Sequence, residues 1–289
     1  MRVYTVASSY VGYGPDGSLV THEGAPFSPD LYSRMKYGSQ SAARTLGVEL
    51  GSAILRQVPG LVLDTRPLVA LLTYKYVPSA AATITRAATC LLSEARLAAG
   101  LSDVQHAHVV TGKVLGRDYS SLDEAGRAAY IAETGYFLRQ EDVDGANVIV
   151  VDDIRNTGAA EDLVFRFTAD KGIENLVLAY VGIMNQEDAR RDPSVERKIN
   201  TSSITDLTGL LEIIDVDGMT LTIRTMKMVL GQKDTAALEA FLRKIPEQLL
   251  FELFQGTLGS GPEFVDYYAD GLAVVRKIAN ERYLLPTTR

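Results

Sequence analysis

The sequence VIVVDDIRNTGAAE, residues 148–161, decides the fold expected of this chain. Val148–Val151 is a short, continuous apolar run, which is typical of a strand buried on both faces of a sheet. Asp152 and Asp153 follow at the carboxyl end of that strand, and a short loop leads through Gly158 into a segment with helical spacing. Ligands of open α/β sheets bind beyond the carboxyl ends of the strands. The loop that begins at Asp152 is therefore the candidate binding site.

The segments that flank this stretch alternate between strand and helix patterns. Short apolar runs predict strands at Leu68–Thr73, His106–Leu115 and Leu176–Met184. Apolar residues three or four positions apart predict helices at Ser41–Gln57, Ala80–Ala99 and Ala159–Lys171. This alternation predicts an α/β fold with a mainly parallel, Rossmann-like sheet and helices on both faces. Ahead of it, the turn-forming residues Gly14–Gly17 predict an N-terminal hairpin or flap.

The pattern changes after about residue 199. Leu221–Val229 suggests a further strand, and three segments between Pro- and Gly-rich breaks have helical spacing: Asp234–Arg243, Pro246–Gln255 and Glu263–Tyr283. We therefore divide the chain into three parts. These are an N-terminal hairpin or hood segment (1–35), a core (36–199), and a mostly helical appendage (200–289) that forms a hood or a dimer contact.

Composition excludes several classes of protein. The chain has 46% hydrophobic and 22% charged residues, close to the average for folded globular domains. A formal net charge of −7 opposes broad attraction to nucleic acid. No apolar run approaches the roughly 20 residues that cross a bilayer. The single cysteine, Cys90, and the absence of a secretory leader favour a reducing cytoplasm. We expect a cytoplasmic protein that binds neither nucleic acid nor membrane.

The candidate loop has the chemistry of a sugar-phosphate site. An ionised carboxylate only accepts hydrogen bonds, so the adjacent acids at 152 and 153 suit the vicinal hydroxyls of a sugar. The backbone N–H groups, the positive end of the following helix and the Thr157 hydroxyl suit a phosphate, and Gly158 lets the backbone come close. The alternatives are a solvated strand end and a metal-binding acid pair, as in a metal-dependent phosphatase. The Thr-Gly loop argues against the phosphatase.

The run VVDDIRNTG, residues 150–158, resembles the phosphoribosyl pyrophosphate (PRPP) signature of the type I phosphoribosyltransferases. That signature is an apolar strand, two acids, three residues and Thr-Gly. The resemblance implies the type I phosphoribosyltransferase fold, with Asp152 and Asp153 binding the ribose hydroxyls. It also implies that the loop holds the 5-phosphate through Arg155, Asn156, Thr157 and Gly158. Asn156 departs from the pattern, because many relatives carry a β-branched or small residue there, and this alters the expected phosphate cradle.

Two further loops follow the order that the resemblance requires. Tyr74, Lys75 and Tyr76 lie where the family has its pyrophosphate loop, and Lys113 and Arg117 lie where it has its flexible catalytic loop. Taken alone, these basic residues also fit ordinary surface positions. Because a Tyr-Lys-x-Val-Pro pattern begins at Tyr74, the chain is most similar to the phosphoribosyltransferases encoded with bacterial tellurite-resistance and stress genes.

The resemblance implies a Mg²⁺-dependent glycosyltransferase of the pentosyltransferase type. Such an enzyme transfers the 5-phosphoribosyl group of PRPP to a nucleobase-like or other small nucleophile and releases pyrophosphate. Lys75, Lys113 and Arg117 would stabilise the leaving group, and Mg²⁺ would bind mainly through PRPP, with Asp152 and Asp153 as candidate protein ligands. A homodimer is the expected assembly. The alternative is a regulatory protein that binds PRPP or a nucleotide without turnover.

Overall fold

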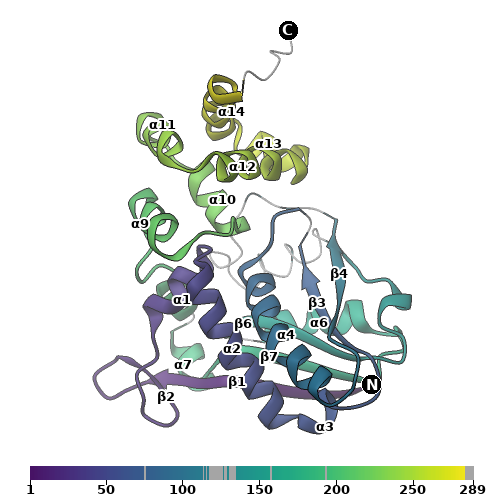
Figure 1. Ribbon diagram of the computed structural model, residues 1–289. Helices are drawn as coiled ribbons and strands as arrows, with labels where there is room; N and C mark the ends of the chain where they lie inside the picture. Colours follow the sequence, from purple (N-terminus) through teal and green to yellow (C-terminus); the bar gives the residue numbers. More distant parts are fainter. Residues whose placement is uncertain are drawn as a thin grey trace.

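The computed structural model describes residues 1–74, 76–112, 114, 116, 126, 129, 135–156, 158–192 and 194–283. Within these ranges seven strands form one sheet in the order β2-β1-β7-β6-β3-β4-β5 (Figure 1). The strands are β1 (Arg2–Tyr13), β2 (Leu19–Thr21), β3 (Leu68–Thr73), β4 (Gln105–Thr111), β5 (Tyr136–Phe137), β6 (Asn147–Arg155) and β7 (Asn175–Met184). The α/β fold expected from the alternating sequence pattern is confirmed.

Strand direction brings the candidate loops together. The strands β1, β7, β6, β3 and β4 run parallel, whereas β2 and β5 pair antiparallel at the two edges. The loops that follow β3, β4 and β6 therefore leave from the same edge of the sheet. The N-terminal hairpin forms as expected, with Gly17 in its turn at a φ of +79°. Its first strand also pairs with β7 from Arg2 to Val11, so this part of residues 1–35 belongs to the central sheet.

Helices cover both faces of the sheet (Figure 1). Side chains of α1, α2, α3 and α4 join the hydrophobic core on one face, and those of α6 join the core on the other. Their bounds are α1 (Pro29–Lys36), α2 (Gln40–Gln57), α3 (Pro59–Val62), α4 (Ala80–Ala98) and α6 (Ala159–Thr168). Serine side chains fix the starts of the two long helices: Ser39 and Ser79 accept hydrogen bonds from the N–H groups of Ala42 and Ala82.

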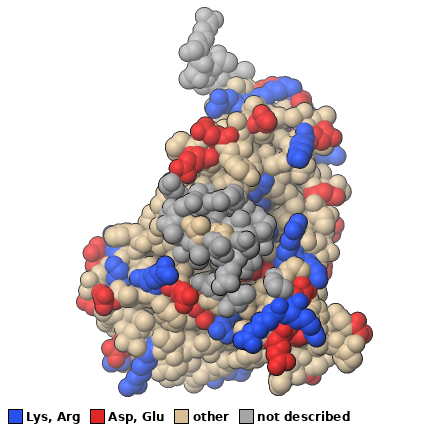
Figure 2. All heavy atoms as spheres, turned by 180° about the vertical axis from the view of Figure 1, so that it is seen from behind, with Lys and Arg blue, Asp and Glu red and all other residues tan. Residues whose placement is uncertain are grey.

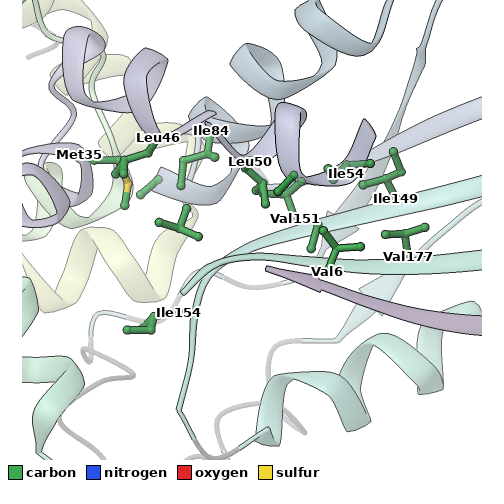
Figure 3. Close-up of a cluster of buried hydrophobic side chains, with 14 of the residues drawn as sticks. Val6, Met35, Leu46, Leu50, Ile54, Ile84, Ile149, Val151, Ile154 and Val177 are labelled. Atoms are coloured by element: carbon green, nitrogen blue, oxygen red, sulfur yellow. The ribbon is translucent and has the colours of Figure 1, made fainter. Parts of the chain in front are cut away.

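Strand β6 contributes to both cores because successive side chains of a strand point to opposite faces. Ile149 and Val151 join the core with α2 and α4, and Figure 3 shows Val151 beside Leu50 and Ile149 beside Ile54. Val148 and Val150 join the core under α6. This alternation explains why four apolar residues stand in succession ahead of the acid pair, since each face of the strand is covered by a helix.

The helices from α9 onward stack beyond the carboxyl edge of the sheet, around a hydrophobic core of their own (Figure 1). After β7 the helices are α7 (Gln186–Arg191), α8 (Val195–Asn200), α9 (Leu207–Glu212), a π-helical turn (Ile213–Asp217), α10 (Ile223–Leu230), α11 (Thr235–Lys244), α12 (Glu247–Gly259), α13 (Pro262–Tyr267) and α14 (Ala269–Tyr283). A short 3-10 helix (Gln140–Asp142) precedes β6. Within the described ranges, none of these helices combines the length and apolar character that crossing a membrane requires.

The prediction of a strand at Leu221–Val229 is wrong, because most of this segment belongs to α10. Thr222 caps the helix by accepting a hydrogen bond from the N–H of Thr225. Met226, Val229 and Leu230 are buried on one side of it, at a spacing of three and four residues. The β-branched and long apolar residues of this short segment resemble a strand, and the helical spacing becomes decisive only once the cap is recognised.

The surface carries charges of both signs. On the face seen in Figure 2, Lys and Arg side chains lie among Asp and Glu side chains and form no single basic surface among the described residues. Proteins that bind the phosphate backbone of nucleic acids use a continuous basic patch or stripe. The described part of this face lacks one.

Candidate functional site

A cavity of about 850 Å³ lies at the carboxyl edge of the sheet. The end of β6 with the start of α6 forms one wall, and the loop after β3 with the first turn of α4 forms another. Residues of α1, β7, α8, α10 and the α13–α14 junction also contribute to the lining. Its volume lies within the range of about 300–1,000 Å³ that is usual for small-molecule sites. The cavity is therefore the candidate active site.

The strand that carries the acid pair separates the two acids. Because β6 remains a strand through Asp152 and Asp153, the two carboxylates leave the backbone in different directions. Asp153 contacts Tyr32 and Lys36 of α1. Asp152 lies beside Tyr180 of β7 in the sheet register, and both acids line the cavity. The sequence places both acids correctly at the strand end, and the structure gives them different surroundings.

The Asp153 carboxylate is held by three protein groups. The Tyr32 hydroxyl donates a hydrogen bond to Oδ1 at 2.9 Å, and the Ile154 N–H donates to the same oxygen at 2.8 Å. Lys36 Nζ forms an ion pair with Oδ2. Burial opposes ionisation of Asp153, but the Lys36 ammonium outweighs it and holds the pKa of this carboxyl below its usual value. Nothing in the local sequence pairs residues 36 and 153, so this partner was missed.

Asp152 has a different environment. Its Oδ1 accepts a hydrogen bond from the Asp153 N–H at 2.9 Å, and no described residue donates a hydrogen bond to its Oδ2. Burial, and then repulsion by the Asp153 carboxylate, raise the pKa of Asp152 to about 7. A ligand that brings hydrogen-bond donors or positive charge to this carboxyl would favour its ionised form.

The start of α6 braces the loop after β6. Arg155 forms a two-pronged ion pair with Glu161, with Nε at 2.8 Å from Oε1 and Nη2 at 3.0 Å from Oε2. The Tyr180 hydroxyl donates a hydrogen bond to the same Glu161 Oε1 at 2.9 Å. All three side chains line the cavity. The predicted phosphate ligand Arg155 is therefore also a structural anchor, a role that the sequence alone did not indicate.

Asn156 and Gly158 complete the described part of this loop, and Thr157 lies outside the described residues. Gly158 has a left-handed φ of +83° directly before α6, a conformation that favours glycine. The Asn156 side chain is 4% exposed, and neither of its amide atoms has a hydrogen-bond partner among the described residues. Its backbone carbonyl accepts from Gln186 Nε2 at 3.3 Å. Both residues line the cavity.

In the loop after β3, Tyr74 and Tyr76 point to different places. Tyr74 lines the cavity, and its hydroxyl accepts a hydrogen bond from Arg86 Nη2 at 3.2 Å. The Tyr76 ring lies against Gly259 of α12, where an added Cβ would come within 2.5 Å of the ring. Lys75, between them, lies outside the described residues. The cavity is also lined by Ala80, Ala81 and Ala82, so the first turn of α4, a natural site for an anion, faces it.

The remainder of the loop after β3 rests on the C-terminal helices. Val77 packs against Gly256 of α12, where an added Cβ would lie 2.5 Å from Val77 Cγ2. The Pro78 carbonyl accepts a hydrogen bond from the Ile223 N–H at the start of α10, at 3.0 Å. The helical segment therefore fixes the position of the loop that the sequence assigns to pyrophosphate.

The segment after β4 also contacts the C-terminal helices. The Gly116 carbonyl accepts a hydrogen bond from the Tyr268 hydroxyl at 2.8 Å, and the Tyr267 ring packs on Gly116. The predicted catalytic residues Lys113 and Arg117 lie outside the described residues. Tyr267 and Tyr268 both line the cavity.

Helix α10 adds two basic residues that sequence reasoning missed. Arg224 and Lys227 are one turn apart, and both line the cavity. They escaped notice because the segment was expected to form a strand. Their helical spacing, together with the Thr222 cap, is the signal that would have placed them on one face.

The donor groups fit one mode of Mg²⁺ binding. Among the described residues, no group of three or more His, Cys, Asp or Glu side chains is placed to hold a metal ion. Mg²⁺ also binds through one or two carboxylates together with substrate phosphates and water. Both acids line the cavity; Asp152 offers an oxygen for that mode, whereas each oxygen of Asp153 already accepts from a protein group.

Comparison with solved structures finds hypoxanthine phosphoribosyltransferases. That of Trypanosoma cruzi shares 16% identity over 52% of this chain and 68% of its own, with a TM-score of 0.33. The hypoxanthine-guanine enzymes of L. donovani and Bacillus anthracis share 16% identity with TM-scores of 0.30 and 0.29. They cover 50% and 53% of this chain, and 70% and 73% of their own. No curated protein matches the chain.

A protein-family model gives a broader match. The model of the family described as PRTase ComF-like, where PRTase denotes phosphoribosyltransferase, matches residues 18–275. The match includes strands β2 to β7, the whole cavity lining, the helices from α1 to α13 and the first part of α14. Together with the sheet topology, it assigns the type I phosphoribosyltransferase fold. The chain belongs to the ComF-like family of phosphoribosyltransferases.

Proposed function

We propose that this protein is a Mg²⁺-dependent pentosyltransferase that transfers the 5-phosphoribosyl group of PRPP to a small nucleophile, with release of pyrophosphate. One observation carries the proposal: the end of β6 with its acid pair, the start of α6 and the start of α4 line one cavity of about 850 Å³. These are a strand end suited to a sugar and two helix N-termini suited to anions. PRPP combines a sugar with phosphates at both ends.

The ribose 5-phosphate half of PRPP is assigned to the loop after β6. The ribose hydroxyls are received at the end of β6, where the acid pair of Asp152 and Asp153 stands. The 5-phosphate lies over the backbone of the loop from Arg155 to Gly158, at the positive end of α6. The left-handed Gly158 and the anchored Arg155 support this assignment, because both hold the loop in one conformation before the ligand arrives.

The pyrophosphate half is assigned to the loop after β3 and the first turn of α4. Tyr74 and the N-terminus of α4 supply hydrogen-bond donors there, and Lys75, Lys113 and Arg117 are proposed as the cations that stabilise the leaving pyrophosphate. Bound Mg²⁺ would supply further neutralisation of its negative charge, with Asp152 as the protein ligand that fits. The chain's own contribution is positioning: it holds the two ends of PRPP apart and leaves the anomeric carbon open to attack.

The acceptor is proposed to enter from the side of the C-terminal helices. Arg224, Lys227 and the tyrosines at the α13–α14 junction line the same cavity as the acid pair. Aromatic rings suit a planar, nucleobase-like acceptor, and basic side chains suit polar or anionic groups on it. In this proposal residues 36–199 form the PRPP-binding core and residues 200–289 the hood. The tellurite-resistance and stress subgroup, the cytoplasm and a homodimer remain our proposals for its relatives, location and assembly.

Binding of PRPP tests the site. Isothermal titration calorimetry with PRPP and Mg²⁺ should show binding to the wild-type protein and a loss of about 10- to 100-fold in affinity for Asp152→Asn. This is the effect of losing a hydrogen bond to a charged acceptor. Circular dichroism and thermal melting confirm that the variant is folded. Equal affinity of the two proteins would sink the site assignment.

Turnover separates an enzyme from a regulatory binder. The wild-type protein, PRPP and Mg²⁺ are incubated with a panel of nucleobases and small amines, and released pyrophosphate is measured. The pentosyltransferase proposal expects release with at least one acceptor, and about 10- to 100-fold slower release from Asp152→Asn at limiting PRPP. Tight PRPP binding with no release from the panel or from a metabolite extract would favour the regulatory alternative.

A further inference from the structure

The acid pair is chemically asymmetric, and the strand imposes the asymmetry. Side chains of a strand alternate between its faces, so two adjacent acids on β6 cannot face one ligand in the same way. Asp153 is 7% exposed and lies beside Tyr32 and Lys36 of α1, which are 0% and 7% exposed. Asp152 lies next to Tyr180 and lines the cavity, as Asp153 and Lys36 also do, so the two acids differ in their protein partners.

Asp153 has little capacity left for a substrate hydroxyl. Its Oδ1 already accepts from the Tyr32 hydroxyl and from the Ile154 N–H, and its Oδ2 is paired with Lys36. Replacing one of these partners with a sugar hydroxyl would leave a buried donor or a buried charge unpaired, which is costly. Asp152, in contrast, receives one described hydrogen bond, from the Asp153 N–H to Oδ1.

Lys36 is also tied into the surrounding structure. Its backbone carbonyl accepts a hydrogen bond from the Thr222 hydroxyl at the start of α10, at 3.2 Å. Two residues earlier, Arg34 forms ion pairs with Asp217 and Glu212 at 2.8 and 2.9 Å. These two acids lie in the segment that leads to α10. The end of β6 is therefore held to α1, and through α1 to the C-terminal helices.

We infer that Lys36 and Asp153 form a positioning pair and that Asp152 alone among the two acids contacts the ribose. The inference rests on the proposed PRPP site and specifies which acid touches the substrate. Lys36 neutralises the second carboxylate, so the phosphates of PRPP approach one uncompensated acid instead of two adjacent ones. The pair also fixes the direction in which Asp152 leaves the strand.

Four variants test whether Lys36 and Asp153 position the site while Asp152 contacts the ribose. They are Lys36→Met, the double variant Lys36→Met with Asp153→Asn, Lys36→Arg, and Asp152→Asn. Lys198→Met is the matched control, because Lys198 of α8 forms a more exposed ion pair with Asp192, and neither residue lines the cavity. Calorimetry measures the affinity of each protein for PRPP with Mg²⁺ and, separately, for inorganic pyrophosphate with Mg²⁺. Thermal melting reports folding.

The expected pattern is specific. Lys36→Met weakens PRPP binding about 10-fold or more, because a charge-assisted contact to the ribose is misplaced. It leaves the affinity for pyrophosphate unchanged. The double variant removes the buried charge together with its partner and returns PRPP affinity to within about threefold of wild type, since a balanced replacement of a buried ion pair is often neutral. Lys36→Arg restores part of the affinity, and Lys198→Met behaves as wild type.

Three results would overturn the inference. A double variant as weak for PRPP as Asp152→Asn would mean that Asp153 itself holds the ribose. Weaker pyrophosphate binding by Lys36→Met would mean that Lys36 touches the leaving group. A wild-type protein that binds no PRPP would overturn the proposed function and this inference together, whereas the first two results leave the proposed function intact. If Lys36→Met does not fold, the double variant and Asp152→Asn still decide the question.

Discussion

The loop that follows β6 and the loop that follows β3 meet at one edge of the sheet, yet different contacts hold them. The first is braced by charge: Lys36 pairs with Asp153 before it, and Glu161 pairs with Arg155 within it. The second is seated by shape: Val77 and Tyr76 pack against Gly256 and Gly259 of α12.

The difference follows from what surrounds each loop. The end of β6 is enclosed by α1 and α6, so acids placed there are partly cut off from water and need partners. The loop after β3 passes under the C-terminal helices, which approach closely because two glycines of α12 lack side chains. The charge-braced loop should therefore respond to changes of charge and pH, and the shape-seated loop to changes of volume.

The largest effect is expected from removing one partner of the buried ion pair. Lys36→Met leaves the Asp153 carboxylate buried without its cation, which costs about 3–5 kcal/mol of unfolding free energy. Adding Asp153→Asn should recover most of that loss. Denaturant unfolding of the single and double variants measures both values. Equal stabilities of wild type and Lys36→Met would show that charge does not brace this loop.

A smaller loss of unfolding free energy is expected from adding a side chain where the loop after β3 packs against α12. In Gly256→Ala the new Cβ would meet Val77 Cγ2 at 2.5 Å and Met226 Sδ at 3.2 Å, so the buried Val77 must shift. Overpacking of this kind costs about 1–3 kcal/mol. Gly60→Ala is the control, because nothing lies within 4 Å of a Cβ there. Chemical unfolding compares the two, and similar behaviour would contradict the packing explanation.

The charge-braced loop should also depend on pH. Because the pKa of Asp152 is raised to about 7 in the folded protein, the folded state holds this proton more tightly than the unfolded chain. The contribution of Asp152 to the free energy of unfolding is fully present below the ordinary pKa of an aspartate. It is lost as pH rises through about 7. Allowing for partial solvent access, the change is about 1–2 kcal/mol.

Comparison of wild type with Asp152→Asn isolates this contribution, since the amide does not titrate. The unfolding free energies of both proteins are measured from pH 4 to pH 8. The variant should gain stability relative to wild type as pH rises. Parallel profiles would show that Asp152 is ionised throughout this range.

The sequence predicted the parts of the site that depend on local order. The apolar run before Asp152 is confirmed as a strand and the segment after Gly158 as a helix, but the strand runs on to Arg155, past the start of the loop expected at Asp152. Their meeting with the loop after β3 also followed, because parallel strands present their carboxyl ends at one edge. Such features are set by the spacing of neighbouring residues.

The rest depends on contacts between distant residues, which one sequence does not reveal. Lys36 reaches Asp153 across 117 positions, and the Thr222 hydroxyl reaches the Lys36 carbonyl across 186. Alternation in β6 could have predicted that the acids diverge, but not which cation would meet the buried one. The basic residues of α10 were missed for a local reason, since a helix was mistaken for a strand.

The segment after β4 should be intermediate between the two loops in the kind of contact that holds it. A hydrogen bond from the Tyr268 hydroxyl to the Gly116 carbonyl, at 2.8 Å, joins it to the C-terminal helices. Tyr268→Phe keeps the ring and removes this donor, so we expect a loss of about 1 kcal/mol in unfolding free energy. Tyr10→Phe on β1, with an exposed ring, is the control and should be neutral. A Tyr268→Phe variant as stable as this control would show that packing of the ring alone holds the segment. The segment after β4 would then be shape-seated like the loop after β3, and the charge-braced loop after β6 would stand apart at this edge of the sheet.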